Sequence, residues 1–262
     1  MKKNWKYLLE PANYYNTPQG RKIAYYQTSG EGIGVVFLGG FKSDMAGTKA
    51  VFLQDWARKN NRPFLRFDYS GHGESSEEFV DGCIGDWKQD AIEIISSLTQ
   101  GPQILVGSSM GGWISLILCK EIPNKICGLV GIAAAPDFTE DSMWASFTKI
   151  QQDQIEKNGY LELPSEYDDG PYIITKKLIM DGRNQLVLKN PLKINFPCRF
   201  LQGTADQDVD ISVALNLINH IKGSDIRLTL VKDVDHRFSN PSNLNLIIKT
   251  IHSVTKAAER IK

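Results

Sequence analysis

The sequence predicts an α/β fold in which helices cover both faces of a mostly parallel central sheet. Short runs that are apolar at every position, such as 35–38 and 128–133, are typical of strands buried on both faces. These runs alternate with stretches whose apolar residues recur at helical spacing, the pattern of parallel sheets with crossover helices. Because such sheets bind ligands beyond the carboxyl ends of their strands, we expect the functional residues in the turns that follow the strands.

Each element is predicted from its local pattern. The expected strands cover residues 21–28, 35–38, 63–67, 104–106, 128–133, 198–202 and 227–230. The expected helices cover 48–59, 86–98, the stretch after Ser109, 213–221 and a closing segment from about 242. In the helix 48–59 we expect four inward residues, Val51, Phe52, Trp56 and Ala57. The closing helix carries one apolar stripe, made of Ile247, Ile251, Val254 and Ile261.

Residues 137–190 interrupt this rhythm. The segment is long and polar with scattered aromatic residues, and we interpret it as a helical cap inserted into a core made of 1–136 and 191–262. Its aromatic residues are Trp144, Phe147, Tyr160, Tyr167 and Tyr172. We expect some of them, with Trp144, Phe147 and Tyr172 as the candidates, to line an acyl channel and bind substrate. The alternative is that they pack the cap against its own helices.

Composition excludes several classes of protein. The 262 residues are 42% hydrophobic and 23% charged, which is typical of a globular protein and of neither a disordered nor a membrane chain. Lys plus Arg and Asp plus Glu both number 30, so the net charge gives no sign of a nucleic-acid partner. The chain has no apolar run of membrane-spanning length and no signal-like or transit-like start, so we expect no stable membrane insertion and a cytoplasmic location.

The cysteines and histidines give no sign of a bound metal. Cys83, Cys119, Cys127 and Cys198 have neither C-x-x-C spacing nor the density of a disulfide scaffold, so we expect reduced thiols. No H-E-x-x-H motif or Cys/His cluster is present. We therefore expect neither a metal nor a cofactor.

The strongest motif is G-x-S-x-G, formed by Gly107, Ser109 and Gly111 between a strand pattern and a helix pattern. A nucleophile on so sharp a turn leaves little room for a Cβ two residues before and after it, which explains the spacing of the glycines. The motif alone also fits an ordinary flexible loop, and Ser108 is a neighbouring hydroxyl. The flanking strand and helix patterns favour Ser109 as a catalytic nucleophile.

A serine nucleophile needs a base, and that base needs an orienting acid. His236 follows the last predicted strand and is the expected base; His72 also follows a strand, whereas His220 and His252 lie within predicted helices. Asp206 follows the strand 198–202 and is the expected acid, with Asp208 and Asp210 as rivals. The order serine, aspartate, histidine is that of α/β hydrolases.

The oxyanion formed during acyl transfer needs two N–H donors. The residue after the nucleophile supplies one, the Met110 backbone N–H. The loop after 35–38 supplies the other, and the Phe41 N–H beside Gly39 and Gly40 is the candidate.

Five stretches of the chain resemble one branch of the α/β-hydrolase superfamily. They are residues 39–50, 66–73, 106–113, 203–206 and 235–237, so the similarity extends over nearly the whole chain. That branch contains the mitochondrial palmitoyl-protein thioesterase, which is also a mycophenolic acid acyl-glucuronide esterase, and bacterial relatives. Asp210 departs from the branch, which usually has proline there, and the cap matches in little but length. The resemblance therefore implies the fold and the hydrolase chemistry but no acyl preference.

These observations predict a serine hydrolase that cleaves carboxylic esters or acyl thioesters through an acyl-enzyme. The expected partners are a small-molecule ester or thioester or an acylated protein. A lyase or perhydrolase would use the same triad, so the sequence leaves both open. A non-catalytic binding protein on this fold is the remaining alternative, and a missing triad member would favour it.

Overall fold

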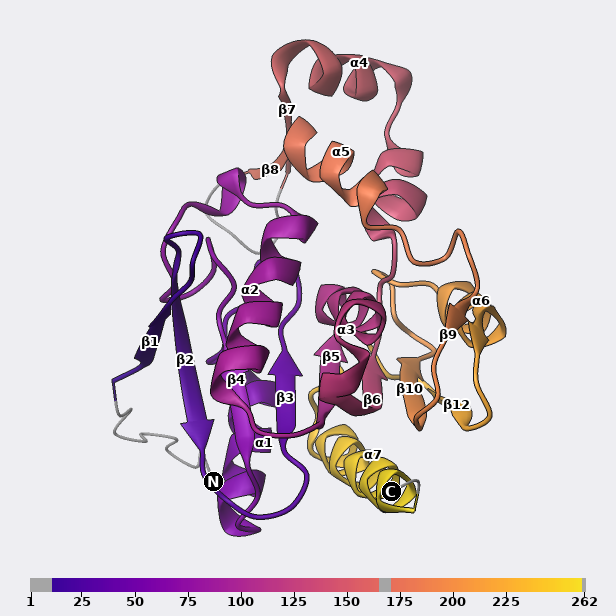
Figure 1. Cartoon of the computed structure of the whole chain (residues 1–262). Coiled ribbons are helices and arrows are strands. Elements are labelled where there is room, and N and C mark those ends of the chain that lie inside the picture. The colour runs from indigo at the N-terminus through magenta and orange to yellow at the C-terminus, as the bar shows by residue number, and fades with distance from the viewer. Residues whose placement is uncertain (1–10, 165–170, 261–262) are drawn as a thin grey trace, which may run out of the picture.

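The computed structural model describes residues 11–164 and 171–260, and its centre is an eight-stranded sheet (Figure 1). The strand order is β1-β2-β4-β3-β5-β6-β10-β12. From β4 to β12 all neighbours are parallel, whereas β1 and β2 form an antiparallel edge. The strands are β1 (Asn13–Asn16), β2 (Lys22–Thr28), β3 (Val35–Leu38), β4 (Phe64–Phe67), β5 (Gln103–Ser108), β6 (Ile126–Ile132), β10 (Cys198–Gly203) and β12 (Ile226–Val231).

Helices cover both faces of this sheet. One face packs against α1 (Thr48–Lys59) and α7 (Pro241–Glu259), and the other against α2 (Ile84–Leu98), α3 (Met110–Glu121) and α6 (Ile211–His220). Strand β3 shows why the sheet needs two layers of helices. Val35 and Phe37 belong to the core on the α1 face, whereas Val36 and Leu38 belong to the core on the α2 face. The predicted α/β fold with a mostly parallel, helix-covered sheet is confirmed.

The segment between β6 and β10 lies beyond the carboxyl ends of the parallel strands (Figure 1). It contains a π-helical turn (Thr139–Trp144), α4 (Lys149–Asn158), β7 (Tyr160–Leu163), β8 (Tyr172–Thr175) and α5 (Lys176–Asn184). Helix α4 begins at a capping box made by Thr148 and Gln151. The segment is helical with an antiparallel β7–β8 pair, which its sequence pattern did not reveal.

Polar contacts join the two ends of this segment and fix it to the core. The buried Asp137 carboxylate accepts hydrogen bonds from the Val187 N–H at 2.8 Å and the Leu188 N–H at 2.9 Å, which joins the two ends of the segment. On α5, Asp181 accepts from the Gly85 N–H of α2. The Trp113 indole of α3 donates to the Gln185 carbonyl. We keep 137–190 as the proposed cap, because these contacts lie near its predicted limits.

The remaining elements are short. Two single-turn 3₁₀ helices cover Phe79–Asp81 and Pro123–Lys125, and β9 (Leu192–Lys193) pairs in parallel with β11 (Ile221–Lys222). The apolar stripe of α7 is buried at Ile247, Ile251 and Val254, while Ile261 lies outside the described residues. No helix in the described ranges is both long and apolar enough to cross a membrane.

Candidate active site

Ser109 occupies a sharp turn between β5 and α3. Strand β5 ends at Ser108 and α3 begins at Met110. Between them Ser109 has φ 54° and ψ −118°, a backbone conformation that residues other than glycine rarely adopt. A Cβ on Gly107 would collide with the Gly111 carbonyl oxygen, and a Cβ on Gly111 with the Leu38 carbonyl oxygen. The two glycines are therefore required by the close approach of the backbone at this turn.

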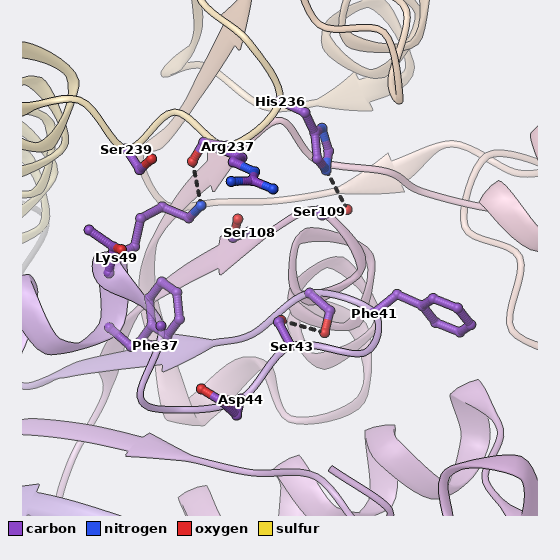
Figure 2. Close-up of a pocket in the computed structure, with 14 residues that line it drawn as sticks. Phe37, Phe41, Ser43, Asp44, Lys49, Ser108, Ser109, His236, Arg237 and Ser239 are labelled. Atoms are coloured by element: carbon purple, nitrogen blue, oxygen red, sulfur yellow. Dashed lines mark hydrogen bonds between the residues drawn. The ribbon is translucent and has the colours of Figure 1, made fainter. Parts of the chain in front are cut away.

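The structure brings Ser109, His236 and Asp206 together, and Figure 2 shows His236 facing Ser109. His236 Nε2 lies 3.1 Å from Ser109 Oγ. On the other side of the ring, Nδ1 lies 2.9 Å from Asp206 Oδ2 and 3.1 Å from Oδ1. These three residues come from loops after β5, β12 and β10, which all end at the same edge of the sheet. Each distance is within hydrogen-bond reach.

The Asp206 carboxylate is fully shielded from solvent and well supplied with donors. Oδ1 accepts from the backbone N–H groups of Asp208 and Val209, and Oδ2 accepts from Gln202 Nε2 at 2.9 Å. Burial acts to raise the pKa of Asp206, but the hydrogen bonds from His236 and these N–H groups outweigh it and hold the pKa below its usual value. The carboxylate is thus ionised and held beside His236 Nδ1.

The other three histidines lie elsewhere. The His72 ring is buried against Tyr69, Phe79 and Trp87, and burial lowers its pKa to about 4. His220 ends α6 and contacts the Asn190 carbonyl, and His252 lies on α7 against Trp56. Among the described histidines, only His236 reaches Ser109.

The rival acids have other positions. Asp210 caps the N-terminus of α6 by accepting the Ser212 N–H at 2.8 Å, and Asp208 is exposed. Asp208 does place a carboxylate oxygen close enough to Asp206 and His236 for the three to surround a cation. Since Asp206 and His236 already hydrogen-bond to each other, we favour the proton-transfer arrangement over a metal site.

The loop after β3 lies against the nucleophile. A Cβ on Gly40 would lie 3.4 Å from the Ser109 Cβ, so the Gly40–Phe41 peptide is next to the serine. Met110 is the first residue of α3, and its N–H has no acceptor within that helix. Among the described residues the Phe41 N–H likewise has no acceptor. The two predicted oxyanion donors are therefore close to Ser109 and available.

The Phe41 side chain points away from Ser109 (Figure 2) and holds in place the loop Gly39–Asp44, which we call the oxyanion loop after its predicted role. Its ring makes edge contacts with Phe79 at 4.9 Å, Phe138 at 5.6 Å and Trp87 at 6.0 Å between centroids. This aromatic cluster joins the loop to α2 and to the start of the proposed cap. Sequence reasoning chose Phe41 for its N–H and missed this role of the ring.

A cavity of about 350 Å³ opens beside Ser109. It lies between the oxyanion loop, the start of α1 and the loop that carries His236 (Figure 2). Two basic residues that we did not predict, Lys49 and Arg237, belong to its lining. Arg237 directly follows the predicted base, which was the one available signal in the sequence.

The three candidate substrate-binding aromatics do not line this cavity. Trp144 packs edge-on against Phe147 and beneath the Arg183 guanidinium, and the Tyr172 ring carries the Lys42 ammonium 4.2 Å from its centroid. Tyr160 is 44% exposed on β7, and Tyr167 lies outside the described residues. In this conformation Trp144 and Phe147 contact each other within the segment and Tyr172 contacts Lys42 of the core, and their assignment to substrate binding stays a prediction.

The chain is similar to known hydrolases in sequence and in fold. A family model described as serine aminopeptidase, S33, matches residues 34–161. The mitochondrial palmitoyl-protein thioesterase ABHD10 of Rattus norvegicus is 33% identical over 240 residues, which are 91% of this chain and 80% of that protein.

Two solved structures are also similar along most of the chain. A putative hydrolase from Agrobacterium vitis S4 is 36% identical with a TM-score of 0.88, covering 94% of this chain and 100% of that one. The mouse α/β hydrolase domain-containing protein 10 is 31% identical with a TM-score of 0.87, covering 94% and 99%. With its fold and its relatives agreeing, the chain belongs to the α/β-hydrolase family that contains palmitoyl-protein thioesterase ABHD10.

Proposed function

We propose that this hydrolase is a serine esterase or thioesterase that works through an acyl-enzyme. The observation that supports it most directly is the continuous chain of hydrogen-bond distances from Asp206 through His236 to Ser109, 2.9 and 3.1 Å. The name of the rat relative, a palmitoyl-protein thioesterase, supports acyl thioesters as one substrate class. We include carboxylic esters because the same triad cleaves both.

In the first half of the reaction Ser109 Oγ attacks the acyl carbon while His236 Nε2 takes the hydroxyl proton. The negative charge that forms on the carbonyl oxygen is stabilised by the N–H groups of Phe41 and Met110. Asp206 stabilises the imidazolium through Nδ1. When the tetrahedral intermediate collapses, the bond to the leaving oxygen or sulfur breaks and that atom takes the proton from Nε2.

In the second half, a water molecule replaces the leaving group. His236 removes its proton, the hydroxide attacks the acyl carbon, and collapse of the second intermediate returns the proton to Ser109 Oγ. The products are a carboxylic acid and an alcohol or thiol, and no cofactor enters the cycle.

A second cavity, of about 610 Å³, is the proposed site for the acyl chain. Ser109 does not line it, but Ala135 in its lining donates its N–H to the Ser109 carbonyl at 3.1 Å, so the two are neighbours. Pro136, Phe138 and Val213 contribute apolar surface. If the chain lies there, kcat/KM should rise several-fold for each added pair of carbons from C2 upward, because each buried CH₂ contributes up to about 0.8 kcal/mol.

The proposal is tested with a fluorophosphonate probe and a panel of p-nitrophenyl esters and acyl thioesters from C2 to C10. We expect the probe to label Ser109, and Ser109→Ala to lose labelling and on the order of 10⁶ in kcat. Ser108→Ala, the neighbouring hydroxyl, is the matched control and should be labelled normally. Labelling of the Ser109→Ala protein at the wild-type rate would place the nucleophile elsewhere.

The same assay separates the alternatives. A non-catalytic binding protein would neither be labelled nor turn over any ester. A perhydrolase would depend on peroxide, and a lyase would yield no ¹⁸O-labelled acid from ¹⁸O-labelled water. A profile that is flat or falling from C2 to C10 would remove the acyl-chain site while leaving the esterase intact.

The cytoplasmic location predicted from the sequence stays a prediction. The rat relative is named as mitochondrial, which leaves the compartment of this protein to be measured by fractionation.

A further inference from the structure

The cavity beside Ser109 has an unusual set of charges in its lining. Lys49 and Arg237 bring two positive charges at neutral pH, and Asp44 brings one negative charge. His236, the proposed base, is the remaining titratable group in the lining. The Asp44 carboxylate is turned toward its own loop, where it accepts the Ala46 N–H at 2.8 Å. The lining is therefore cationic next to the proposed nucleophile.

The positive charge of the Lys49 ammonium is poorly balanced by nearby negative charge. It donates one hydrogen bond, to the Arg237 carbonyl, and no carboxylate of the described residues lies within 4.0 Å of it. Burial lowers the pKa of Lys49 to about 8, an effect that the Asp235 charge opposes and the Arg237 charge adds to. An ammonium has three N–H donors, so Lys49 has donor capacity left for a ligand. A half-buried cation without a paired anion is costly and is typical of functional sites.

The start of α1 adds to this positive field. Gly47 to Ala50 line the cavity and form the N-cap and first turn of a 12-residue helix. That turn contains no acidic residue, and Gly47 has no side chain to cap its N–H groups. Both features leave the positive end of the helix dipole directed at the same space as the Lys49 ammonium.

We propose that this cavity binds a carboxylate carried by the substrate, with Lys49 and Arg237 as its cationic partners. The inference rests on the proposed function, because it places the carboxylate on the ester or thioester that Ser109 attacks. Lys49 and Arg237 would then determine specificity, since a charged substrate gains hydrogen bonds that an equally long neutral one lacks. The simpler explanation, that Lys49 only ties α1 to the His236 loop, predicts equal effects on both kinds of substrate.

The test uses two pairs of substrates that differ in charge but hardly in size. For a carboxylate on the acyl side, the pair is 4-nitrophenyl hydrogen adipate and 4-nitrophenyl heptanoate. For a carboxylate on the leaving group, the pair is 3-(hexanoyloxy)benzoate and 3-(hexanoyloxy)benzamide. The readout is the ratio of kcat/KM for the charged substrate to that for the neutral one. The pair with the larger ratio identifies which side of the substrate occupies the cavity.

We expect Lys49→Met to lower that ratio by about 10-fold to 100-fold, the usual worth of hydrogen bonds to a charged group. Arg237→Gln should lower it less, Lys49→Arg should restore it, and Asp44→Asn should raise it. Lys59→Met, which removes an exposed lysine at the far end of α1, is the matched control and should leave it unchanged.

The outcomes are separable. An unchanged ratio in Lys49→Met for both pairs, even with lower overall activity, would show that Lys49 is only a structural tether and would overturn the inference. Turnover of the neutral substrates would still support the esterase. A wild-type protein that cleaves none of the four substrates would reject the proposed function and this inference with it.

Discussion

Replacing Asp206 by asparagine tests the triad with almost no change in shape. The two oxygens of the Asp206 carboxylate are not equivalent, and this decides how an asparagine amide would lie. Oδ1 accepts two backbone N–H groups, from Asp208 and Val209, which cannot turn away. An amide nitrogen at that position would face two donors, so the amide oxygen must take it.

The amide nitrogen is then forced to the position of Oδ2, 2.9 Å from His236 Nδ1. Gln202 Nε2 also faces Oδ2, and it donates a second hydrogen bond to the Val209 carbonyl at 3.0 Å. If Gln202 rotates its amide to present Oε1, which has no partner among the described residues, the asparagine amide gains an acceptor but the Val209 carbonyl loses its donor. The variant therefore loses one hydrogen bond at this point, which should lower the free energy of unfolding by only about 1 kcal/mol. Its amide donates to Nδ1, which puts the ring proton on Nε2 and leaves no lone pair facing Ser109.

We therefore expect kcat to fall by about 10⁴, or about 5.5 kcal/mol of transition-state stabilisation, as wrong-tautomer variants of other triads do. KM and the thermal unfolding midpoint should change little. The assay is steady-state hydrolysis of the best p-nitrophenyl ester, together with the rate of fluorophosphonate labelling, which should fall in parallel because labelling needs the same base.

Asp208→Asn is the matched control, since Asp208 is exposed two residues away and donates only its backbone N–H to Asp206. It should keep kcat within a few-fold of wild type. The reasoning is refuted if Asp206→Asn retains more than a tenth of the activity, or if Asp208→Asn or Asp210→Asn is the more damaging change.

Three further predictions follow from the structure. Gly111→Ala places a Cβ against the Leu38 and Gly39 carbonyl oxygens, so it should displace the oxyanion loop and lower kcat at least 10²-fold in the ester assay, the usual worth of one oxyanion donor; wild-type turnover would show that the turn has room. Asp137→Ala leaves the Val187 and Leu188 N–H groups without an acceptor and should lower the free energy of unfolding in urea by about 3 kcal/mol. Asp137→Asn, which keeps one acceptor, should lose less, and equal losses would contradict this account. Because burial lowers the pKa of Lys49 to about 8, its ammonium is present below that pH and lost above it. The charged-to-neutral ratio of kcat/KM should therefore fall between pH 7 and pH 9, and a ratio constant over that range would argue against Lys49 as the cationic partner.

The local sequence pattern was enough to predict the helices and strands of the core. The helix predicted at 48–59 is α1, Thr48–Lys59, and the buried strands were found within about two residues. The predicted inward face of that helix was partly wrong, because Val51 and Phe52 are only half-buried. The buried residues are Ala50, Leu53, Gln54, Trp56 and Ala57. The helical period fixes which residues share a face, but the direction of that face is set by where the sheet and α7 lie.

Elements that depend on a distant partner were missed. Strand β1 is four residues of Asn and Tyr, and it is a strand because it pairs with β2 at the sheet edge. The β7–β8 pair is another case, because its apolar pattern is too short to stand out. Both pairs lie outside the parallel core. Their strands are not buried on both faces, so their sequences need no continuous apolar run.

The sequence by itself determined the nucleophile turn and the order of the candidate triad. The reason is that a sharp turn demands glycine at Gly107 and Gly111, and parallel strands place the loops after them at one edge. Only the tertiary structure decided between His236 and His72, which both follow strands, because the distance to Ser109 depends on strand order and not on sequence separation. The same holds for Lys49, because its neighbours along the chain do not indicate a functional role. Its weakly balanced positive charge arises from the tertiary structure, where α1 meets the His236 loop.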